Sequence, residues 1–227
     1  MNPFILVAVC LVAVIDWLAV WRNWRQVGYA AKPLTILLLL AWFWGNTGLQ
    51  GPALWFGLGL ITSLLGDIFL MLSARFFMAG MISFALTQVF YFIGFLAPFP
   101  TISFLNLVIL ILILLGFSMV ILKRILTAQR KRGSKKLMGP TFMYAMLING
   151  MLLSALLSLF RPEWTFGNAI LVSLGAVLFY ASDLLNAWIR FVNPERKGRT
   201  LVMVTYHLGQ LLLMLGLAGQ FTAVPGV

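Results

Sequence analysis

Two aspartates interrupt long apolar stretches of this chain: Asp67 lies in ITSLLGDIFLML and Asp183 in LGAVLFYASDLLNAWI. The whole chain has only five acidic residues. A carboxylate inside a membrane costs several kcal/mol unless a partner compensates it. Two carboxyl groups that face one site can divide acid and base work between them, as paired carboxylates do in glycoside hydrolysis. Asp67 and Asp183 are therefore our candidate catalytic residues.

The composition places these aspartates in a membrane protein. The chain has 227 residues, of which 62% are hydrophobic and 9% charged, and its mean hydropathy is +1.03. Soluble domains are roughly half apolar. Long unbroken apolar runs, rather than ten-residue alternations, favour membrane helices over a β-barrel. The chain is thus predicted to be a polytopic, all-α membrane protein.

Eight apolar segments are long enough to cross a bilayer as helices. They cover residues 4–21, 33–49, 52–72, 78–97, 101–122, 138–160, 165–189 and 200–224. The connections between them are short, which leaves no room for a separate soluble domain. We predict a single transmembrane bundle over residues 1–227. The first segment is expected to remain in the mature protein, because no basic residue precedes it.

The basic residues predict the orientation in the membrane. All 16 Lys and Arg residues except Arg161 fall in the connections between segments one and two, three and four, five and six, and seven and eight. By the positive-inside rule these connections are cytoplasmic and both termini lie on the other side. Their expected partners are anionic phospholipid headgroups. Compact size and minimal loops favour a bacterial inner membrane.

Nucleic acid, metals and cofactors are not expected as partners. The net charge is +11, but the basic run KRILTAQRKRGSKK lies between two spans and has no interleaved aromatic residues. Cys10 is the single cysteine and His207 the single histidine. A disulfide within the chain is therefore impossible, and a zinc site of three or four ligands is not predicted. The oligomeric state is not specified by the sequence.

Further polar side chains lie near the depth of the two aspartates. Asp67 precedes Arg75 by eight residues and Asp183 precedes Arg190 by seven, which at about 1.5 Å per residue puts each roughly 9–12 Å inside the cytoplasmic boundary. The spacing of the other polar residues along their helices places them on faces that we expect to point inward, near the depth of the two aspartates. We expect a cavity there that opens toward the cytoplasmic leaflet. Its expected supporting residues are Ser63, Gln88, Tyr91, Tyr144, Ser182, Asn186, Tyr206, His207 and Gln210.

Three basic residues lie at the predicted rim of this cavity. Lys32, Arg75 and Arg190 could hold the phosphate of a lipid there. Lys32 also has a simpler interpretation as an interfacial anchor, because Pro33 behind it suits the first turn of a helix.

Other residues have plainer interpretations too. The two aspartates could belong to a buried polar network that only joins helices. His207 could be a hydrogen-bonded structural partner rather than a base. Asp16 stands near a predicted helix end, where Arg22 and Arg25 could pair with it.

Several segments resemble the YhhN/TMEM86 family of membrane proteins. They are Lys32-Pro33, SLLGDIFLML, FFMAGMISFAL, QVFYFIGF, LGAVLFYASDLLNA and TYHLGQLLL, in this order over most of the chain. The resemblance implies an eight-helix bundle with lysoplasmalogenase activity, which hydrolyses a vinyl ether to a fatty aldehyde and a glycerophospho-alcohol. It also implies that Asp67 and Asp183 match important aspartates of the family. One departure is Gln88, where relatives often carry a histidine.

The residues suit that chemistry. Vinyl ether hydrolysis starts with protonation of carbon and gives an oxocarbenium ion that water captures, so it needs no serine nucleophile. One acid must keep its proton near neutral pH, and a second carboxylate can stabilise positive charge or activate water. We predict these roles for Asp67 and Asp183, without assigning which is the acid. The residues expected to orient them or the water are Asn186, Tyr206, His207 and Gln210.

Transport is the main alternative function. Intramembrane carboxylates also form proton relays, and a basic rim above a polar layer could move a lysolipid or a small anionic solute. Against transport, the sequence has no paired Gly/Pro-broken helices of the inverted-repeat kind. A serine hydrolase is disfavoured because the chain has no G-x-S-x-G motif. A purely structural protein would tolerate asparagine at both aspartates.

Overall fold

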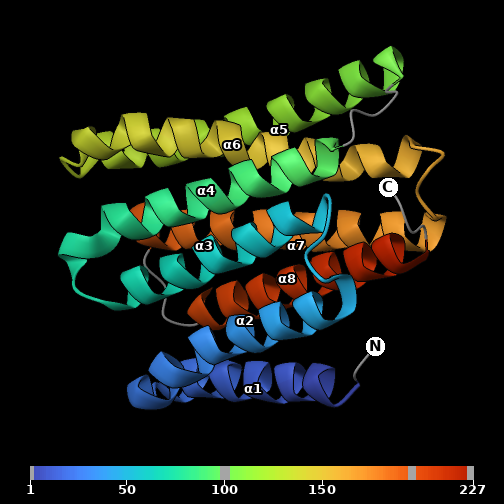
Figure 1. Ribbon diagram of the computed structural model, residues 1–227. Helices are drawn as coiled ribbons and strands as arrows, with labels where there is room; N and C mark the ends of the chain where they lie inside the picture. Colours follow the sequence, from blue (N-terminus) through green and yellow to red (C-terminus); the bar gives the residue numbers. More distant parts are fainter. Residues whose placement is uncertain (1–2, 98–102, 194–197, 224–227) are drawn as a thin grey trace.

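The computed structural model describes residues 3–97, 103–193 and 198–223, and within these ranges the chain is helical without strands (Figure 1). The long helices are α1 (Pro3–Arg22), α2 (Arg25–Thr47), α3 (Ala53–Met71), α4 (Phe77–Leu96), α5 (Phe104–Lys131), α6 (Met138–Leu157), α7 (Phe166–Phe191) and α8 (Gly198–Ala223). Short 3-10 turns lie at η1 (Ala74–Phe76), η2 (Lys135–Leu137) and η3 (Ser158–Phe160). The all-α prediction is confirmed.

Eight helices of the described chain are long and apolar enough to cross a membrane. Lipid offers no partners to backbone N–H and C=O groups, so a spanning helix must satisfy them within itself. The predicted number of spanning segments is therefore confirmed by length and composition.

Two helices are longer than the apolar runs predicted. α2 begins at Arg25, so Pro33 lies inside the helix and its predicted first-turn position is wrong. Residues 25–32 are too polar to extend an apolar run, but they still form helical hydrogen bonds. α5 continues past residue 122 to Lys131, and its 28 residues span about 42 Å. Because the hydrocarbon layer is only about 30 Å thick, the basic end of α5 extends beyond it.

Some predicted features fall outside the described residues. These are the basic residues Arg196 and Lys197 of the last predicted cytoplasmic connection, and the predicted segment ends at residues 101 and 224.

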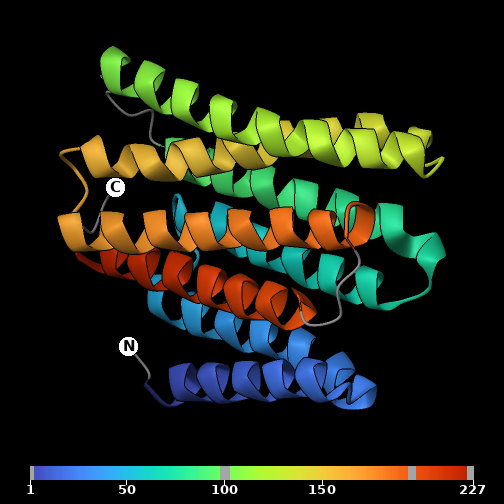
Figure 2. The same ribbon diagram turned by 180° about the vertical axis from the view of Figure 1, so that it is seen from behind.

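Consecutive helices pack as hairpins in which α1 lies on α2, α3 on α4, and α7 on α8. α8 also contacts α1 and α2, and α4 contacts α6, so the α3–α4 and α7–α8 hairpins form the middle of the bundle (Figures 1 and 2). α5 lies at the outer edge against α6 and α7. α3 touches α8 at only a few positions, which leaves space between the two central hairpins.

Aromatic side chains fill the centre of this interface. Phe56, Tyr91, Phe95 and Phe179 are fully buried. Tyr91 on α4 meets Phe179 on α7 edge-on at a ring distance of 6.3 Å, and Phe56 on α3 meets Phe221 on α8 at a tilt and a ring distance of 6.1 Å. Such tilted contacts between large rings fix the relative position of the hairpins in this half of the bundle.

The end of the bundle away from the basic connections is tied together by Arg161. Its guanidinium is buried, pairs with Glu163 at 2.7 Å and donates to the carbonyl oxygen of Phe95 at 2.5 Å. The side chain of Gln220 on α8 donates to the carbonyl oxygen of Glu163 at 2.8 Å. The one basic residue outside the basic connections therefore joins α4, the loop before α7, and α8.

Glycines let the backbones of α7 and α8 touch. A Cβ atom on Gly209 would lie 2.7 Å from the backbone nitrogen of Phe179, and one on Gly175 would lie 2.6 Å from that of Leu213. No larger residue fits against a backbone atom at these distances, and small residues are the usual means of close helix packing in membranes. This contact fixes the spacing of α7 and α8, which carry Asp183 and Tyr206 further along.

Replacing Gly209 with alanine should therefore destabilise the bundle. We expect Gly209→Ala to cost about 1–3 kcal/mol of unfolding free energy, because the new methyl group must push α7 away from α8. Thermal unfolding in detergent measures this cost. Gly116→Ala on α5 is the matched control, since a Cβ there has no neighbour within 4 Å. Equal melting temperatures for the two variants would contradict the packing argument.

Candidate active site

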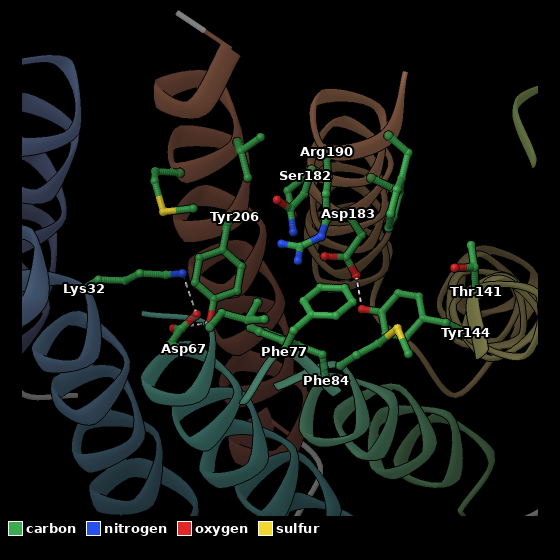
Figure 3. A pocket seen from close by; sticks show the side chains of 17 residues that line it. Lys32, Asp67, Phe77, Phe84, Thr141, Tyr144, Ser182, Asp183, Arg190 and Tyr206 are labelled. Atoms are coloured by element: carbon green, nitrogen blue, oxygen red, sulfur yellow. Dashed lines mark hydrogen bonds and ion pairs between the residues drawn. The ribbon is translucent and has the colours of Figure 1, made fainter. Parts of the chain in front are cut away.

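A cavity of about 110 Å³, open to the surface beside Asn186 and Arg190, lies between the α3–α4 and α7–α8 hairpins (Figure 3). Side chains from α2 and α6 complete its walls. It lies toward the end of the bundle where α3 and α7 finish and α4, α6 and α8 start. Its volume has room for several water molecules, but not for a whole lipid. Asp67 and Asp183 both line it from opposite sides, so the structure brings the two candidate aspartates to one hollow.

Asp67 is fully buried and both of its carboxylate oxygens have partners. The ammonium nitrogen of Lys32 lies 2.8 Å from Oδ1, and the hydroxyl of Tyr206 donates to Oδ2 at 2.8 Å. A buried carboxylate needs such compensation, because the interior cannot replace its hydration. Asp67 is thus held from two sides by α2 and α8.

Lys32 lies deeper than an interfacial anchor would. The sequence suggested either a snorkelling anchor or a rim residue for phosphate, but the side chain points into the cavity and is only 13% exposed. α2 places it there because the helix starts before Lys32 instead of after it. Its charge is therefore engaged by Asp67.

A chain of hydrogen bonds continues behind Asp67 into the bundle. The hydroxyl of Tyr206 also meets that of Ser63 at 2.8 Å, and the side-chain amide of Gln210 donates to Ser63 at 3.0 Å. Tyr91 in turn donates to Gln210 at 2.7 Å. These residues do not line the cavity, except for Tyr206. They fix the phenol of Tyr206 against Asp67 from behind.

Asp183 has a different environment. The hydroxyl of Tyr144 and the side-chain amide of Gln88, at 3.3 Å, both donate to its Oδ2. Within the described chain no side chain donates to Oδ1, and Asp183 is only partly buried. Oδ1 is therefore the carboxyl oxygen of this residue that is free to meet a molecule in the cavity. The family departure at Gln88 falls at a residue that directly contacts Asp183.

Arg190 provides the unpaired positive charge of the cavity. Its guanidinium carbon lies 3.6 Å from the ring centre of Phe77, and no ion pair of the described residues includes it. Asn186 and Ser182 also line this wall on α7. Arg75 is exposed as well, but it lies on η1, packs over Phe76 at 4.8 Å and is outside the cavity. Of the three predicted rim cations, Arg190 alone is unpaired and faces the cavity.

His207 lies away from the cavity, between α8 and α1. The indole nitrogen of Trp17 donates to its Nδ1 at 3.1 Å, and a carboxylate oxygen of Asp16 lies 4.0 Å from the same nitrogen. This geometry favours the interpretation of His207 as a structural partner. Asp16 is buried and pairs with neither Arg22 nor Arg25 among the described residues, because it points inward.

Sequence patterns missed several side chains of the site. Phe77, Met81, Phe84 and Met203 give the cavity an apolar wall, and Thr141 contributes a hydroxyl. Apolar residues in an apolar helix carry no distinguishing signal, so spacing alone does not separate a cavity wall from a lipid-facing surface. Trp17 could have been found only by knowing that α1 packs against α8.

Removing the cation beside Asp67 should unfold the protein more readily. We expect Lys32→Met to cost about 3 kcal/mol of unfolding free energy, because it leaves a buried carboxylate without its ion pair. The double variant Lys32→Met with Asp67→Asn should lose less than Lys32→Met alone, because no charge then remains unpaired. Thermal unfolding of both proteins in the same detergent tests the pair. A double variant that is no more stable than Lys32→Met would show that the two side chains do not compensate each other.

The chain is similar to known proteins over most of its length. The model of the YhhN family matches residues 27–217. The chain is 29% identical over 217 residues to lysoplasmalogenase TMEM86B of Mus musculus, with 95% of this chain and 84% of that protein covered. No solved structure gives a significant match. The family match contains all the cavity residues described above, whereas Asp16 and Trp17 precede it.

Proposed function

This chain belongs to the YhhN family, and we propose that it is an intramembrane hydrolase that cleaves the vinyl ether of lysoplasmalogen-type lipids. The name of the mouse relative supports the lipid class and the bond. The observation that supports the proposal is the pair of carboxyl groups on opposite sides of one cavity, each with different partners.

The reaction divides into a protonation and a hydration. An acid gives its proton to the vinyl carbon farther from the ether oxygen, which leaves an oxocarbenium ion. Water then adds to the carbon next to that oxygen and loses a proton to a carboxylate, giving a hemiacetal. The ether oxygen then takes the proton back from this carboxylate and its bond to the carbon breaks, while the hemiacetal hydroxyl gives its proton to the first acid. These transfers release a fatty aldehyde and the glycerophospho-alcohol and restore both carboxyl groups. The net change is the addition of one water molecule.

Asp183 is the acid in this scheme. Its Oδ2 accepts from Tyr144 and Gln88, while Oδ1 has no partner in the described chain and is free to carry a proton into the cavity. Both oxygens of Asp67 are already bound by donors, so it is less suited to present a proton. Tyr144 and Gln88 then act as positioning residues that turn the proton-carrying oxygen toward the substrate.

Asp67 is the second carboxylate. Its charge lies on the opposite side of the cavity, where it stabilises the oxocarbenium ion and can accept a proton from the attacking water through a remaining lone pair. Lys32 and Tyr206 hold it in place. The cavity has room for the reacting carbons and a water molecule, so the alkenyl chain must leave it between the helices.

Replacing either carboxyl group should stop aldehyde release. We expect Asp183→Asn and Asp67→Asn to lose about 100-fold or more in kcat, the usual range for an acid or base that takes part in proton transfer. Purified protein with a vinyl-ether lysophospholipid and a coupled aldehyde assay measures this, beside the ester analogue as substrate.

Asp16→Asn is the matched control, because Asp16 is also a buried aspartate of a spanning helix but does not line the cavity. It should keep most of the activity. Full activity in Asp183→Asn, or equal loss in all three variants, would eliminate the assignment.

Arg190 is the proposed phosphate ligand. It is the unpaired cation that lines the cavity, and its guanidinium can bind two phosphate oxygens at once. Arg190→Gln should raise KM about tenfold with little change in kcat, since a hydrogen bond to a charged group is worth roughly 1.5–3 kcal/mol. Arg75→Gln removes the same charge outside the cavity and should change KM less than about twofold. A larger effect in Arg75→Gln would move the phosphate site to the surface.

Proton-coupled transport of a lysolipid or small anion is the second candidate. The observation that favours it is the hydrogen-bonded chain from Asp67 through Tyr206, Ser63 and Gln210 to Tyr91, which resembles a proton path into the bundle. Flux across sealed vesicles without aldehyde release would establish transport and exclude hydrolysis.

The orientation belongs to the proposal as well. The end of the bundle that contains the cavity carries the basic connections, so we place it at the cytoplasmic leaflet, with both termini on the other side. A bacterial inner membrane suits this arrangement. Accessibility of an engineered cysteine at position 134, probed from each side of sealed vesicles, tests the orientation.

A further inference from the structure

A second hollow lies on the outside of the bundle, between α5 and α7. It has a volume of about 550 Å³, several times that of the catalytic cavity. Val120, Ile121 and Arg124 line it from α5, and Ala181, Leu184 and Trp188 are among the residues that line it from α7. α5 is the outermost helix on this side of the bundle (Figure 2). The hollow therefore faces lipid and is large enough for part of a ligand.

This groove is distinct from the catalytic cavity. Asp183, Asn186 and Arg190 turn toward the cavity, whereas Leu184 and Trp188 turn toward the groove. The two hollows thus use different faces of α7. A ligand of the groove would pack against the helix that carries Asp183 without touching the reacting groups.

The depth of Arg124 matches the headgroup level of a bilayer. Arg124 comes 20 residues after Phe104, where α5 begins, which corresponds to about 30 Å of helix and about the thickness of the hydrocarbon layer. Val120 and Ile121 lie roughly one turn deeper. Trp188 on the facing helix is an aromatic residue of the kind that gathers at membrane interfaces. The groove consequently has a cation at the headgroup level and apolar walls toward the centre of the bilayer.

No carboxylate of the described residues pairs with Arg124. The two ion pairs of the described chain involve Asp67 and Glu163, while Asp16 lies beside His207, and none of these contacts includes Arg124. Asp183, the remaining acidic residue of the described ranges, is bound by Tyr144 and Gln88 in the catalytic cavity. An anion from outside the chain is the natural partner of this guanidinium.

We propose that the groove binds one anionic phospholipid of the bilayer. Arg124 holds the phosphate, one acyl chain fills the space between α5 and α7, and the indole of Trp188 packs beside the glycerol region. The order of cation, indole and apolar wall matches the order of phosphate, glycerol and chain in the lipid. The lipid fills the space between the outer helix α5 and α7 and contacts both. Its loss should loosen the packing of α5 and leave the hydrolysis unchanged.

Native mass spectrometry of the full chain, released from detergent and titrated with phosphatidylglycerol, tests this site. Arg124→Gln removes the phosphate contact, and Ala181→Phe fills the hollow without changing any charge. Each should weaken binding of the first phosphatidylglycerol about fivefold or more. Arg124→Gln loses a hydrogen bond to a charged group, which is worth over 1 kcal/mol. Ala181→Phe leaves no space for the acyl chain. Lys123→Gln is the matched control, since Lys123 is adjacent, exposed and outside the groove. It should change binding less than about twofold.

Two results would overturn the proposal. Equal losses in Arg124→Gln and Lys123→Gln would mean that the lipid responds to general positive charge and not to the groove. Unchanged binding in Ala181→Phe would mean that no chain enters the hollow. Aldehyde release is measured on the same proteins to separate this site from the catalytic proposal. The two lipid-binding results do not depend on hydrolysis, so each proposal can fail without the other.

Discussion

The structure depends on how one buried carboxylate is compensated. Asp67 lies in the interior of a bundle that is otherwise apolar, where an unpaired charge would cost several kcal/mol. Lys32 and Tyr206 supply that compensation from α2 and α8. Since Asp67 is on α3, this single cluster links two consecutive helices, α2 and α3, to α8 near the other end of the chain. The three residues of the cluster line the cavity, so the cluster holds α2, α3 and α8 together along one of its walls.

Close packing of α7 on α8 carries the second wall. The glycine contacts at Gly175 and Gly209 let the two backbones touch, and this leaves Tyr206 on α8 and Asp183 on α7 on neighbouring parts of one rigid pair. The α3–α4 hairpin meets this pair through the rings of Tyr91 with Phe179 and Phe56 with Phe221, and is separated from it by the cavity further along. The cavity is the space left by that separation. Rigid pairs on both sides keep the carboxyl groups in fixed positions.

The two carboxyl groups differ in their partners, and the proposed division of work follows from that difference. Asp67 faces a cation and a phenol, and its proposed role is to present negative charge. Asp183 is bound on one oxygen only, so its other oxygen can exchange a proton with a substrate. Reactions that pass through a cationic intermediate need both functions at once, and the largely apolar lining of the cavity strengthens each of them.

Composition and helical period were enough to predict the class of fold and most of the helices. Apolar length alone identified eight spanning segments, because lipid forces each of them to satisfy its own backbone. The same rule does not identify the start of α2, because residues 25–32 are helical but do not extend the apolar run. Pro33 was consequently misplaced. The rarity of acidic residues in apolar helices was also sufficient to select Asp67 and Asp183 as candidates.

By itself, then, the sequence determined which residues are too costly to bury without a purpose, because that cost is a property of each side chain in lipid. Only the tertiary structure decided which of them meet. It gave Lys32 to Asp67, Tyr144 and Gln88 to Asp183, and left His207 outside the cavity. The physical reason is that partners on different helices are chosen by packing across the bundle, and helical spacing within one segment carries no information about the helix that faces it.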